Sequence, residues 1–498
     1  MVSLTGSSLT LEDVERVALD GATVSLREDA IERMRASRAV VERLALGEAP
    51  VYAVNTGVGY LADTRIPADE LEQLQRNVVR SHACGVGEPL PEADVRAMML
   101  IRANVVAKGL SGIRPEVAEM LCEMLNRGVT PVVPARGSVG ASGDLAPLAH
   151  MALVLIGEGK ASFRGETADG GEALRRAGLK PVTLAAKEGI SLVNGTQAML
   201  GAGALELLAA EALSDVADVA CAMSLDALRG TPRAFDQRIH EARPHPGQII
   251  SAKRLESLLE GSEIRQSHAA CRRVQDAYSL RCAPQVHGAV RDALAEVRRV
   301  FSIELNSATD NPLVFGEEIL SGGNFHGEHL ALVLDYAAIA LAALAGISER
   351  RIDRLVNPML SEGLPPFLAG HAGLESGYMM VQVSAAALAA EIRVLATPAS
   401  PGSITTSGNK EDFVSMGMTS ALKLQQVVEH VRSILAMEMM AAAQALEFLR
   451  PLRTSPALET IRAELAKVSP PRKEDRPFAE ELASVKAWLK GWRKRTIA

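Results

Sequence analysis

Three consecutive residues, Ala141, Ser142 and Gly143, have the composition needed to build a reactive group from the main chain itself. Gly143 has no side chain to shield its backbone nitrogen, so that nitrogen can attack the carbonyl carbon of Ala141 and close a ring. Loss of water, in which Ser142 gives up its hydroxyl group, leaves a methylidene group conjugated to an imidazolone ring. Such a ring accepts electrons as no ordinary side chain does, so these residues predict a built-in electrophile.

The surrounding sequence places these residues in a loop that leads into a helix. The loop is rich in glycine over 137–140, and an apolar run follows over 145–156. Asp144 is predicted to be the N-cap of that helix, with Pro147 tolerated in its first turn. The positive end of the helix dipole then faces the ring and favours negative charge that develops there. Alone, an Ala-Ser-Gly stretch is usually an ordinary loop before a helix, so the interpretation depends on the remaining sequence.

Residues 137–148 closely resemble the signature of the aromatic amino acid ammonia-lyases and aminomutases. These enzymes form a 4-methylidene-imidazol-5-one ring from Ala-Ser-Gly without an external cofactor, so the resemblance implies this ring at Ala141, Ser142 and Gly143. The resemblance extends over most of the chain. Further matching blocks follow in the family's order, at 52–57, 81–87, 194–196, 243–248, 275–282, 310–313, 323–326 and 409–412.

Within this family, the blocks around His82 and Glu411 look most like those of histidine ammonia-lyases, which release ammonia from L-histidine to leave urocanate. The resemblance implies a fumarase/aspartase-like superfamily architecture, with a long central helical bundle. It also implies a homotetramer whose active sites are built from more than one chain, and an amino acid as the small-molecule substrate.

Two tyrosines are candidates for the catalytic base. Ammonia loss needs a group that removes the β-proton and a means of turning the amine into a better leaving group. Tyr52 lies in a glycine-bearing loop, 52–59, which is suited to close over a substrate, and it is the leading candidate. A tyrosine must have a lowered pKa to serve as a base, and a second tyrosine such as Tyr278 can assist it. Addition of the substrate amine to the ring and attack by the substrate imidazole both fit the sequence.

Arg281 is a candidate for binding the substrate carboxylate. It lies three residues after Tyr278, on the same face of a helix, and its planar guanidinium suits a bidentate contact with a carboxylate. A structural ion pair fits the same residue equally well. The resemblance implies that Asn194 and Gln275 hold the carboxylate and border the ring, and that Phe325 packs beside it.

His82 and Glu411 are the predicted determinants of specificity. One neutral ring nitrogen and one carboxylate suit the two polar edges of an imidazole, and Glu411 is also expected to take part in proton transfer. Histidine ammonia-lyases typically have Gln and His where this chain has Lys410 and Phe413. If Lys410 pairs with Glu411, the pocket is expected to prefer a different imidazole or phenol side chain.

Three functions therefore stay open. The first is ammonia elimination from L-histidine. The second is a related lyase or 2,3-aminomutase that acts on tyrosine, phenylalanine or a modified histidine. The third, from another class, is a helical scaffold or binding protein that keeps the fold without catalysis.

The composition favours helices and a small-molecule partner. The chain has 498 residues, of which 48% are hydrophobic and only 3% aromatic, a balance that suits buried helices better than β-sandwiches. A net charge of −7 argues against nucleic acid as a partner, because that affinity depends on clustered Lys and Arg. No cluster of His, Cys or acidic residues has the spacing of a metal site, so no metal is expected.

The cysteines and the N-terminus predict a cytoplasmic protein. The odd number of cysteines and the absence of a C-x-x-C pair fit reduced thiols, at Cys84, Cys122, Cys221, Cys271 and Cys282. Residues 1–20 lack the basic and then apolar pattern of a signal peptide. The apolar stretch 330–347 carries Asp335 and is expected to be a buried bundle helix and not a membrane span.

The periodicity predicts a mainly α fold. A helix is expected from Pro91 to about Gly109, and longer helices at about 145–157, 197–228, 265–308, 328–356, 375–396 and 413–447. Several are apolar on nearly every face and must be buried by neighbouring elements. Small strands are expected in the first 60 or so residues and over 160–185, and a last helix after a surface loop at 470–475. The expected regions are a mixed N-terminal region at 1–185, the long-helix bundle at 186–450 and a C-terminal helical tail at 451–498.

Overall fold

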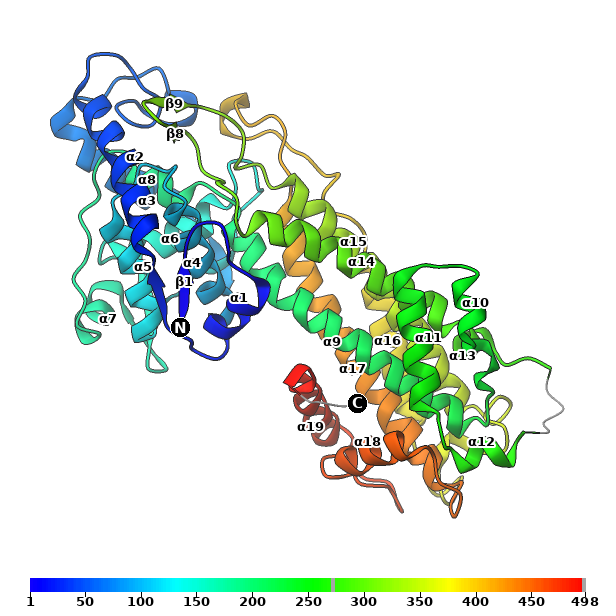
Figure 1. Cartoon of the computed structure of the whole chain (residues 1–498). Helices are drawn as coiled ribbons and strands as arrows, with labels where there is room; N and C mark the ends of the chain where they lie inside the picture. The colour runs from blue at the N-terminus through cyan, green and yellow to red at the C-terminus, as the bar shows by residue number, and fades with distance from the viewer. Residues whose placement is uncertain (270–273, 495–498) are drawn as a thin grey trace. The chain divides into compact units, whose positions relative to one another are not determined.

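The computed structural model describes residues 1–269 and 274–494, and it confirms the predicted mainly α fold (Figure 1). Residue contacts divide the chain into two compact units, each built from three segments. The first unit contains Met1–Glu206, Arg298–Asp335 and Pro398–Leu422, and the second contains Leu207–Val297, Tyr336–Thr397 and Lys423–Ala498. The separation of an N-terminal region, a bundle and a tail at residues 185 and 450 stays a prediction.

The first unit combines helices with four small sheets. Its helices are α1 (Leu11–Ala18), α2 (Glu28–Leu46), α3 (Leu71–His82), α4 (Glu92–Ala107), α5 (Pro115–Arg127), α6 (Leu145–Leu155), α7 (Gly170–Arg176) and α8 (Glu188–Val193), with short turns η1 (Gly59–Leu61), η2 (Ala68–Glu70) and η5 (Ser407–Asn409). The predicted strands near the N-terminus and after residue 160 are confirmed. The strands are β1 (Val2–Leu4), β2 (Val24–Leu26), β3 (Val86–Pro89), β4 (Val129–Pro131), β5 (Pro134–Arg136), β6 (Lys160–Phe163), β7 (Glu166–Asp169), β8 (Leu313–Phe315) and β9 (Glu318–Leu320).

The sheets are small and local. Strands β1 and β2 pair in parallel, β3 pairs with β5, β8 pairs with β9, and β4, β6 and β7 form an antiparallel sheet in the order β4-β6-β7. None of these strands exceeds four residues within the described part of the chain. The helices therefore carry most of the core, and the strands tie loops to it.

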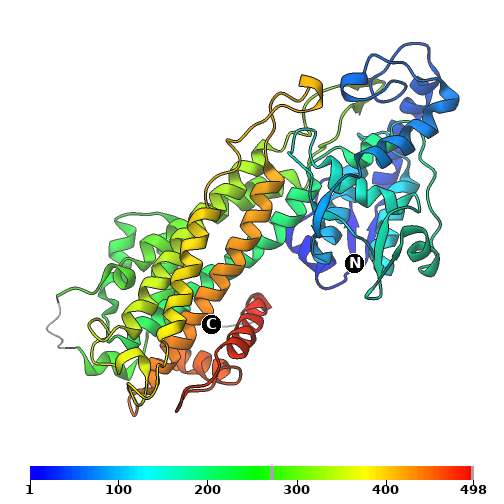
Figure 2. The ribbon, with the colours of Figure 1, turned by 180° about the vertical axis from the view of Figure 1, so that it is seen from behind.

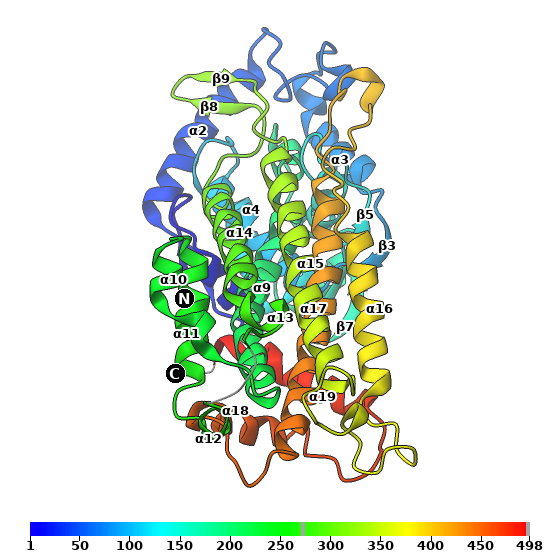
Figure 3. The ribbon, with the colours of Figure 1, turned by 90° about the vertical axis from the view of Figure 1, so that its right-hand side faces the viewer.

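Four long helices contribute residues to both units: α9 (Gln197–Ala227), α14 (Ala283–Glu304), α15 (Glu328–Val356) and α17 (Gly417–Glu447). The second unit adds η3 (Pro232–Phe235), α10 (Gln237–Glu241), α11 (Pro246–Leu258), α12 (Glu263–Ser267), α13 (Tyr278–Arg281), η4 (Pro366–Leu368), α16 (Met379–Leu395), α18 (Pro456–Ala466), α19 (Ala479–Lys490) and η6 (Trp492–Lys494). Figures 2 and 3 show α15, α16 and α17 lying side by side. The predicted helices at 145–157, 197–228, 328–356, 375–396 and 413–447 are confirmed to within a few residues.

The single helix predicted at 265–308 is wrong. The chain forms α12, the short α13 and then α14, which begins at Ala283. Pro284 has no N–H group, so it fits the first turn of a new helix but not the interior of a continuous one. The part of the prediction at 270–273, including Cys271, lies outside the described residues. The other four cysteines are free thiols.

The apolar helix α15 is the one described helix that is long and apolar enough to cross a membrane. Its most apolar stretch is 56% buried within the protein, so it is not a clear membrane span. Asp335 interrupts the apolar run for a structural reason. Its carboxylate accepts hydrogen bonds from the backbone nitrogens of Ala399 and Ser400, both at 2.8 Å.

A buried ion pair joins α15 to α17 in the second unit. Both Arg351 and Glu438 are fully buried, and the guanidinium donates to the two carboxylate oxygens at 2.5 and 2.9 Å. The hydroxyl groups of Ser224 and Ser348 donate to the same carboxylate at 2.8 and 2.6 Å. A further nitrogen of Arg351 donates to the backbone oxygen of Ser279 at 3.3 Å, so this pair also fixes the position of α13.

The structure corrects the predicted role of Asp144 as a helix cap. Asp144 stands at the N-cap position of α6, but its side chain makes no hydrogen bond to that helix. Its carboxylate instead accepts from the backbone nitrogen of Met199, in the first turn of α9, and from the hydroxyl of Ser138, both at 2.8 Å. Asp144 therefore connects the loop before α6 to the beginning of α9.

Glu438→Gln is expected to lower the free energy of unfolding by about 3–5 kcal/mol, because the buried guanidinium of Arg351 loses its counter-charge. Urea unfolding followed by circular dichroism measures this loss. Glu464→Gln is the matched control: Glu464 pairs with Lys467 at the surface, so the same change is expected to cost less than about 1 kcal/mol. Equal losses in the two variants would contradict a special role for the buried pair.

Asp144→Asn is expected to change how stability depends on pH. Burial raises the pKa of Asp144 from 3.8 to about 6, and hydrogen bonds from Met199 and Ser138 offset this only in part. Because the folded-state pKa lies above the unfolded value, the stabilising contribution of Asp144 is complete below about pH 4 and is lost as the pH rises through about 6. Relative to Asp144→Asn, the unvaried protein should lose on the order of 3 kcal/mol across that range in urea unfolding. A constant difference between the two would refute this expectation.

Candidate active site

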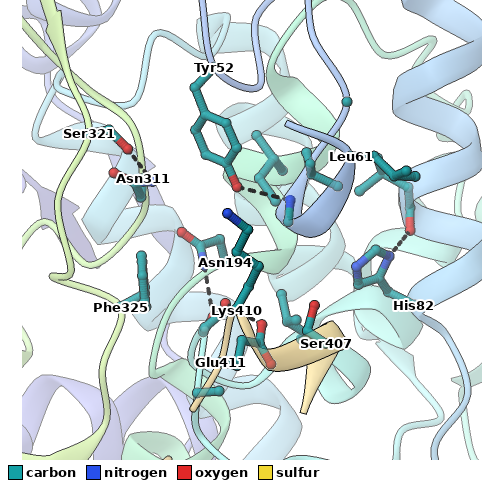
Figure 4. Close-up of a pocket in the computed structure, with 18 of the residues that line it drawn as sticks. Tyr52, Leu61, His82, Asn194, Asn311, Ser321, Phe325, Ser407, Lys410 and Glu411 are labelled. Atoms are coloured by element: carbon teal, nitrogen blue, oxygen red, sulfur yellow. Dashed lines mark hydrogen bonds between the residues drawn. The ribbon is translucent and has the colours of Figure 1, made fainter. Parts of the chain in front are cut away.

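A cavity of about 890 Å³ lies in the first unit. Its wall comes from the end of α3, the loop 52–66, the loop before α6, the end of α8 and the segments 321–326 and 407–413. Seven of the residues singled out from the sequence line it: Tyr52, His82, Ala141, Ser142, Asn194, Phe325 and Glu411 (Figure 4). The structure thus brings together residues that are up to about 360 positions apart in the chain.

The backbone of the Ala-Ser-Gly stretch passes very close to another part of the main chain. Gly143 has a φ of +71°, and a Cβ atom built on it would lie 2.1 Å from the backbone oxygen of Gly195. Only glycine fits this position, for both its backbone conformation and its space. The next residue, Asp144, donates its N–H to the same Gly195 oxygen at 2.7 Å.

Ser142 is held on two sides. Its hydroxyl donates to Oε1 of Glu411 at 2.9 Å, and its backbone oxygen accepts from Nδ2 of Asn194 at 2.8 Å. Oε2 of Glu411 accepts from the hydroxyl of Thr406 at 2.7 Å. The side chain and the carbonyl group of Ser142 each have a polar partner on the cavity wall.

Two helices begin beside this stretch. Helix α6 begins at Leu145, and α9 begins at Gln197, directly after the Gly195 segment that contacts Gly143. The first N–H groups of a helix lack partners within the helix, and the dipole adds partial positive charge there. Negative charge that develops on Ala141, Ser142 or Gly143 is therefore stabilised at this place.

His82 is the last residue of α3, and a hydrogen bond fixes its tautomer. Nδ1 lies 2.7 Å from the backbone oxygen of Val78 and 3.2 Å from the hydroxyl of Ser81. A carbonyl oxygen only accepts, so Nδ1 carries the proton. Nε2 of the neutral ring is then an acceptor and is available to an N–H group of a ligand (Figure 4).

Tyr52 presents its hydroxyl group to the cavity. The hydroxyl oxygen accepts from the backbone nitrogen of Gly59 at 3.3 Å, within the glycine-bearing loop. Figure 4 shows the side chain of Lys410 extending in the direction of Tyr52. Within the described part of the chain, Lys410 forms no ion pair with Glu411, contrary to the pairing considered above. Both oxygens of Glu411 are already engaged, by Ser142 and Thr406.

Three predicted site residues lie in the second unit and do not line this cavity. Tyr278 and Arg281 belong to α13, and the guanidinium carbon lies 4.7 Å from the centre of the tyrosine ring. The prediction that they share one face is confirmed. Tyr278 is 71% exposed and Gln275 is also exposed, whereas Arg281 is half-buried and its Nε is buried without a hydrogen-bond partner among the described residues.

Three further contacts at the site were not predicted as contacts from the sequence. Thr406 orients Glu411 because the segment 406–411 folds back on itself, a turn that no motif predicts. Asn311 donates to Ser321 at 3.0 Å on the cavity wall, and only the matching block at 310–313 pointed to it. Phe413 stacks on His326 with 6.0 Å between ring centres. Across residues 1–269 and 274–494, no three His, Cys, Asp or Glu side chains are grouped as metal ligands.

Comparison with known proteins agrees with this geometry. A family model described as aromatic amino acid lyase matches residues 9–467. The chain is 58% identical to a histidine ammonia-lyase of Koribacter versatilis (strain Ellin345), over 98% of this chain and 97% of the relative. It is 54% identical to a histidine ammonia-lyase of Sorangium cellulosum (strain So ce56), over 97% of this chain and 96% of the relative.

Solved structures extend the comparison to the fold. A histidine ammonia-lyase from Trypanosoma cruzi matches with a TM-score of 0.92 and 44% identity, over 98% of this chain and 93% of the other. A tyrosine aminomutase from Streptomyces globisporus matches with a TM-score of 0.93 and 39% identity, over 99% of this chain and 97% of the other. The resemblance inferred from the sequence blocks is confirmed: the chain belongs to the aromatic amino acid lyase family.

Proposed function

We propose that this protein is a carbon–nitrogen lyase that eliminates ammonia from L-histidine to give urocanate. The observation that carries the proposal is one cavity that holds Ser142 against Glu411 and also presents Nε2 of His82. The relatives described above, named histidine ammonia-lyases, support the same substrate. The cavity walls belong to one unit, so these groups are placed by a single compact body.

The tripeptide fits the proposed 4-methylidene-imidazol-5-one ring. The main-chain contact at Gly143 admits no side chain, and Asn194 donates to the carbonyl group of Ser142. The group is proposed to form from Ala141, Ser142 and Gly143 without an external cofactor. When present, it supplies an electron sink that makes the substrate amine a better leaving group.

The remaining residues bind the substrate and move its protons. We assign removal of the β-proton to Tyr52, because the Gly59 N–H at its oxygen suits a phenolate, the form of the side chain that can take up a proton. Phe325 is assigned to packing beside the ring. Glu411 is assigned both to the substrate imidazole and to proton transfer.

The groups without partners in the cavity fit an imidazole better than a phenyl ring. Nε2 of His82 has no partner among the described protein groups and is an acceptor in the neutral ring, and Lys410 offers a donor. An imidazole has one N–H donor and one acceptor nitrogen, so it can satisfy groups of both kinds. A phenyl ring leaves them unpaired, which costs affinity.

We propose that Gln275, Tyr278 and Arg281 complete the site from another copy of the chain, in a homotetramer with shared active sites. Arg281 is suited to the substrate carboxylate, and Tyr278 assists the base. The exposed positions of Gln275 and Tyr278 in their own unit support a role at a surface between copies. Helix α16 also exposes apolar side chains, at Met380, Val383 and Val394. The free thiols support a cytoplasmic setting.

One observation favours a second candidate, a lyase or 2,3-aminomutase that acts on tyrosine, phenylalanine or a modified histidine. The ammonium group of Lys410 extends into the cavity and does not pair with Glu411 (Figure 4). A free ammonium group at this place suits a phenol oxygen as well as an imidazole nitrogen.

Incubation of the purified protein with L-histidine is expected to produce the absorbance of urocanate. Ser142→Ala is expected to abolish turnover and to leave the helical circular dichroism unchanged, because it removes the hydroxyl group that ring formation requires. Ser302→Ala, on the exposed face of α14, is the matched control and should keep full activity.

A panel of tyrosine, phenylalanine and modified histidines separates the candidates. Products from these substrates with none from histidine, whether cinnamate-type acids or β-amino acids, would establish the second candidate. An unmodified intact mass together with no turnover on any substrate would establish a non-catalytic scaffold.

Co-expression of Ser142→Ala with Tyr278→Phe is expected to restore activity that each variant lacks alone. If each active site combines a cavity from one chain with α13 from another, random mixing of equal amounts gives about a quarter of the sites an intact cavity together with an intact α13. Turnover in mixed oligomers, purified with two different tags, measures the recovery. Ser142→Ala with Tyr52→Phe is the control, because both changes affect the same cavity and should not complement. Absence of recovery in the first pair would reject shared sites.

A further inference from the structure

The contact between Ser142 and Glu411 exists while Ser142 still has its hydroxyl group. It therefore belongs to the chain before the ring has formed, when no substrate can yet react. We infer that Glu411 acts as an acid–base group in the maturation of the tripeptide, by assisting the departure of the Ser142 hydroxyl. This inference rests on the proposed ring, and it assigns to Glu411 a step that precedes its proposed role with substrate.

The carboxyl group of Glu411 is aligned for this step. Oε1 accepts from the hydroxyl of Ser142 at 2.9 Å, so a proton taken up on Oε1 lies within hydrogen-bond distance of the leaving oxygen. Oε2 is held by the hydroxyl of Thr406 at 2.7 Å, and the backbone nitrogen of Thr406 donates to the backbone oxygen of Glu411 at 2.9 Å. The carboxyl group thus has a fixed orientation towards Ser142 and is not a mobile surface acid.

The carbonyl group of Ser142 has a hydrogen-bond donor that can stabilise the negative charge created by this step. Removal of the Cα proton of Ser142 moves negative charge onto its carbonyl oxygen, as in an enolate. That oxygen accepts from Nδ2 of Asn194 at 2.8 Å, and the beginnings of α6 and α9 lie beside it. Asn194 is itself fixed, because its backbone oxygen accepts from the fully buried guanidinium of Arg102.

The bonds and protons of this maturation balance as two losses of water. In one, the Gly143 nitrogen bonds to the Ala141 carbonyl carbon, and the Ala141 oxygen leaves with the amide protons of Gly143 and Ser142. In the other, the Cα–H and Cβ–Oγ bonds of Ser142 break and a Cα–Cβ double bond forms. The Cα proton passes to solvent, and the Glu411 carboxylate takes up a proton from solvent and gives it to the departing Oγ, so that water leaves and the carboxylate is restored. No oxidant or reductant is needed.

The inference also explains how one carboxyl group can serve twice. While Ser142 is intact, its hydroxyl occupies Oε1 of Glu411. When the hydroxyl leaves as water, Oε1 loses this donor and becomes available to an N–H group of the substrate. Maturation and substrate binding are then successive uses of the same oxygen atom.

Intact mass tests the inference without a measurement of activity. The unvaried protein is expected to lack two waters relative to its sequence mass. Glu411→Gln keeps the size of the side chain but has no acidic proton to give, so it should retain at least one of these waters at the same time after synthesis. Asp412→Asn is the matched control: it changes the neighbouring acid on the cavity wall and is expected to lack both waters.

Each outcome separates this inference from the proposed function. Loss of both waters by Glu411→Gln, at the rate of the unvaried protein, would overturn the inference and leave the proposed function in place. Retention of both waters by the unvaried protein would overturn both. If Glu411→Gln does not fold by circular dichroism, Thr406→Val keeps the carboxyl group but releases Oε2. Slower loss of the second water in that variant supports the inference, and an unchanged rate overturns it.

Discussion

The approach of the main chain at Gly143 to the main chain at Gly195 is the constraint on which the candidate site depends. A Cβ atom at Gly143 would lie 2.1 Å from the Gly195 oxygen, so the two segments meet only because neither has a side chain there. This contact puts the start of α6 beside the start of α9. It also turns Ser142 between Asn194 and Glu411, where its carbonyl oxygen and its hydroxyl find different partners. The electrostatics and the geometry of the site follow from one backbone contact.

Buried charges hold that contact in place. Fully buried Arg102 donates to the backbone oxygens of Ser191 and Asn194, at the end of α8, where carbonyl groups have no partner within the helix. The carboxylate of Asp144 in turn accepts from the backbone N–H of Met199, at the start of α9. Burying either charge is costly, and burial lowers the pKa of Arg102 to about 10 while it raises that of Asp144 to about 6. The cost is tolerated because each charge satisfies backbone groups that water cannot reach.

Sequence reasoning succeeded where the signal is periodic or carried by a motif. The helix at 328–356 was predicted with the bounds that the structure has, because its apolar repeat is long. The gathering of His82, Ser142 and Glu411 was predicted from matching blocks and not from spacing. Capping rules consider only the helix that directly follows the capping residue. They therefore did not predict that the carboxylate of Asp144 accepts a hydrogen bond from α9, which begins more than 50 residues later. Thr406 was missed because its role comes from a turn that closes on itself.

The buried ion pair in the second unit, Arg351 with Glu438, does more than stabilise the helix bundle: it also fixes where a neighbouring segment lies. Replacing a buried ion pair by apolar side chains of similar volume is often neutral for stability, because desolvation offsets most of the Coulombic gain. An apolar side chain, however, cannot donate to the backbone oxygen of Ser279, as Arg351 does. That contact ties the four-residue α13 to the bundle, in addition to the buried side chain of Leu280. The buried charge therefore also positions the backbone of α13, whose last residue is Arg281.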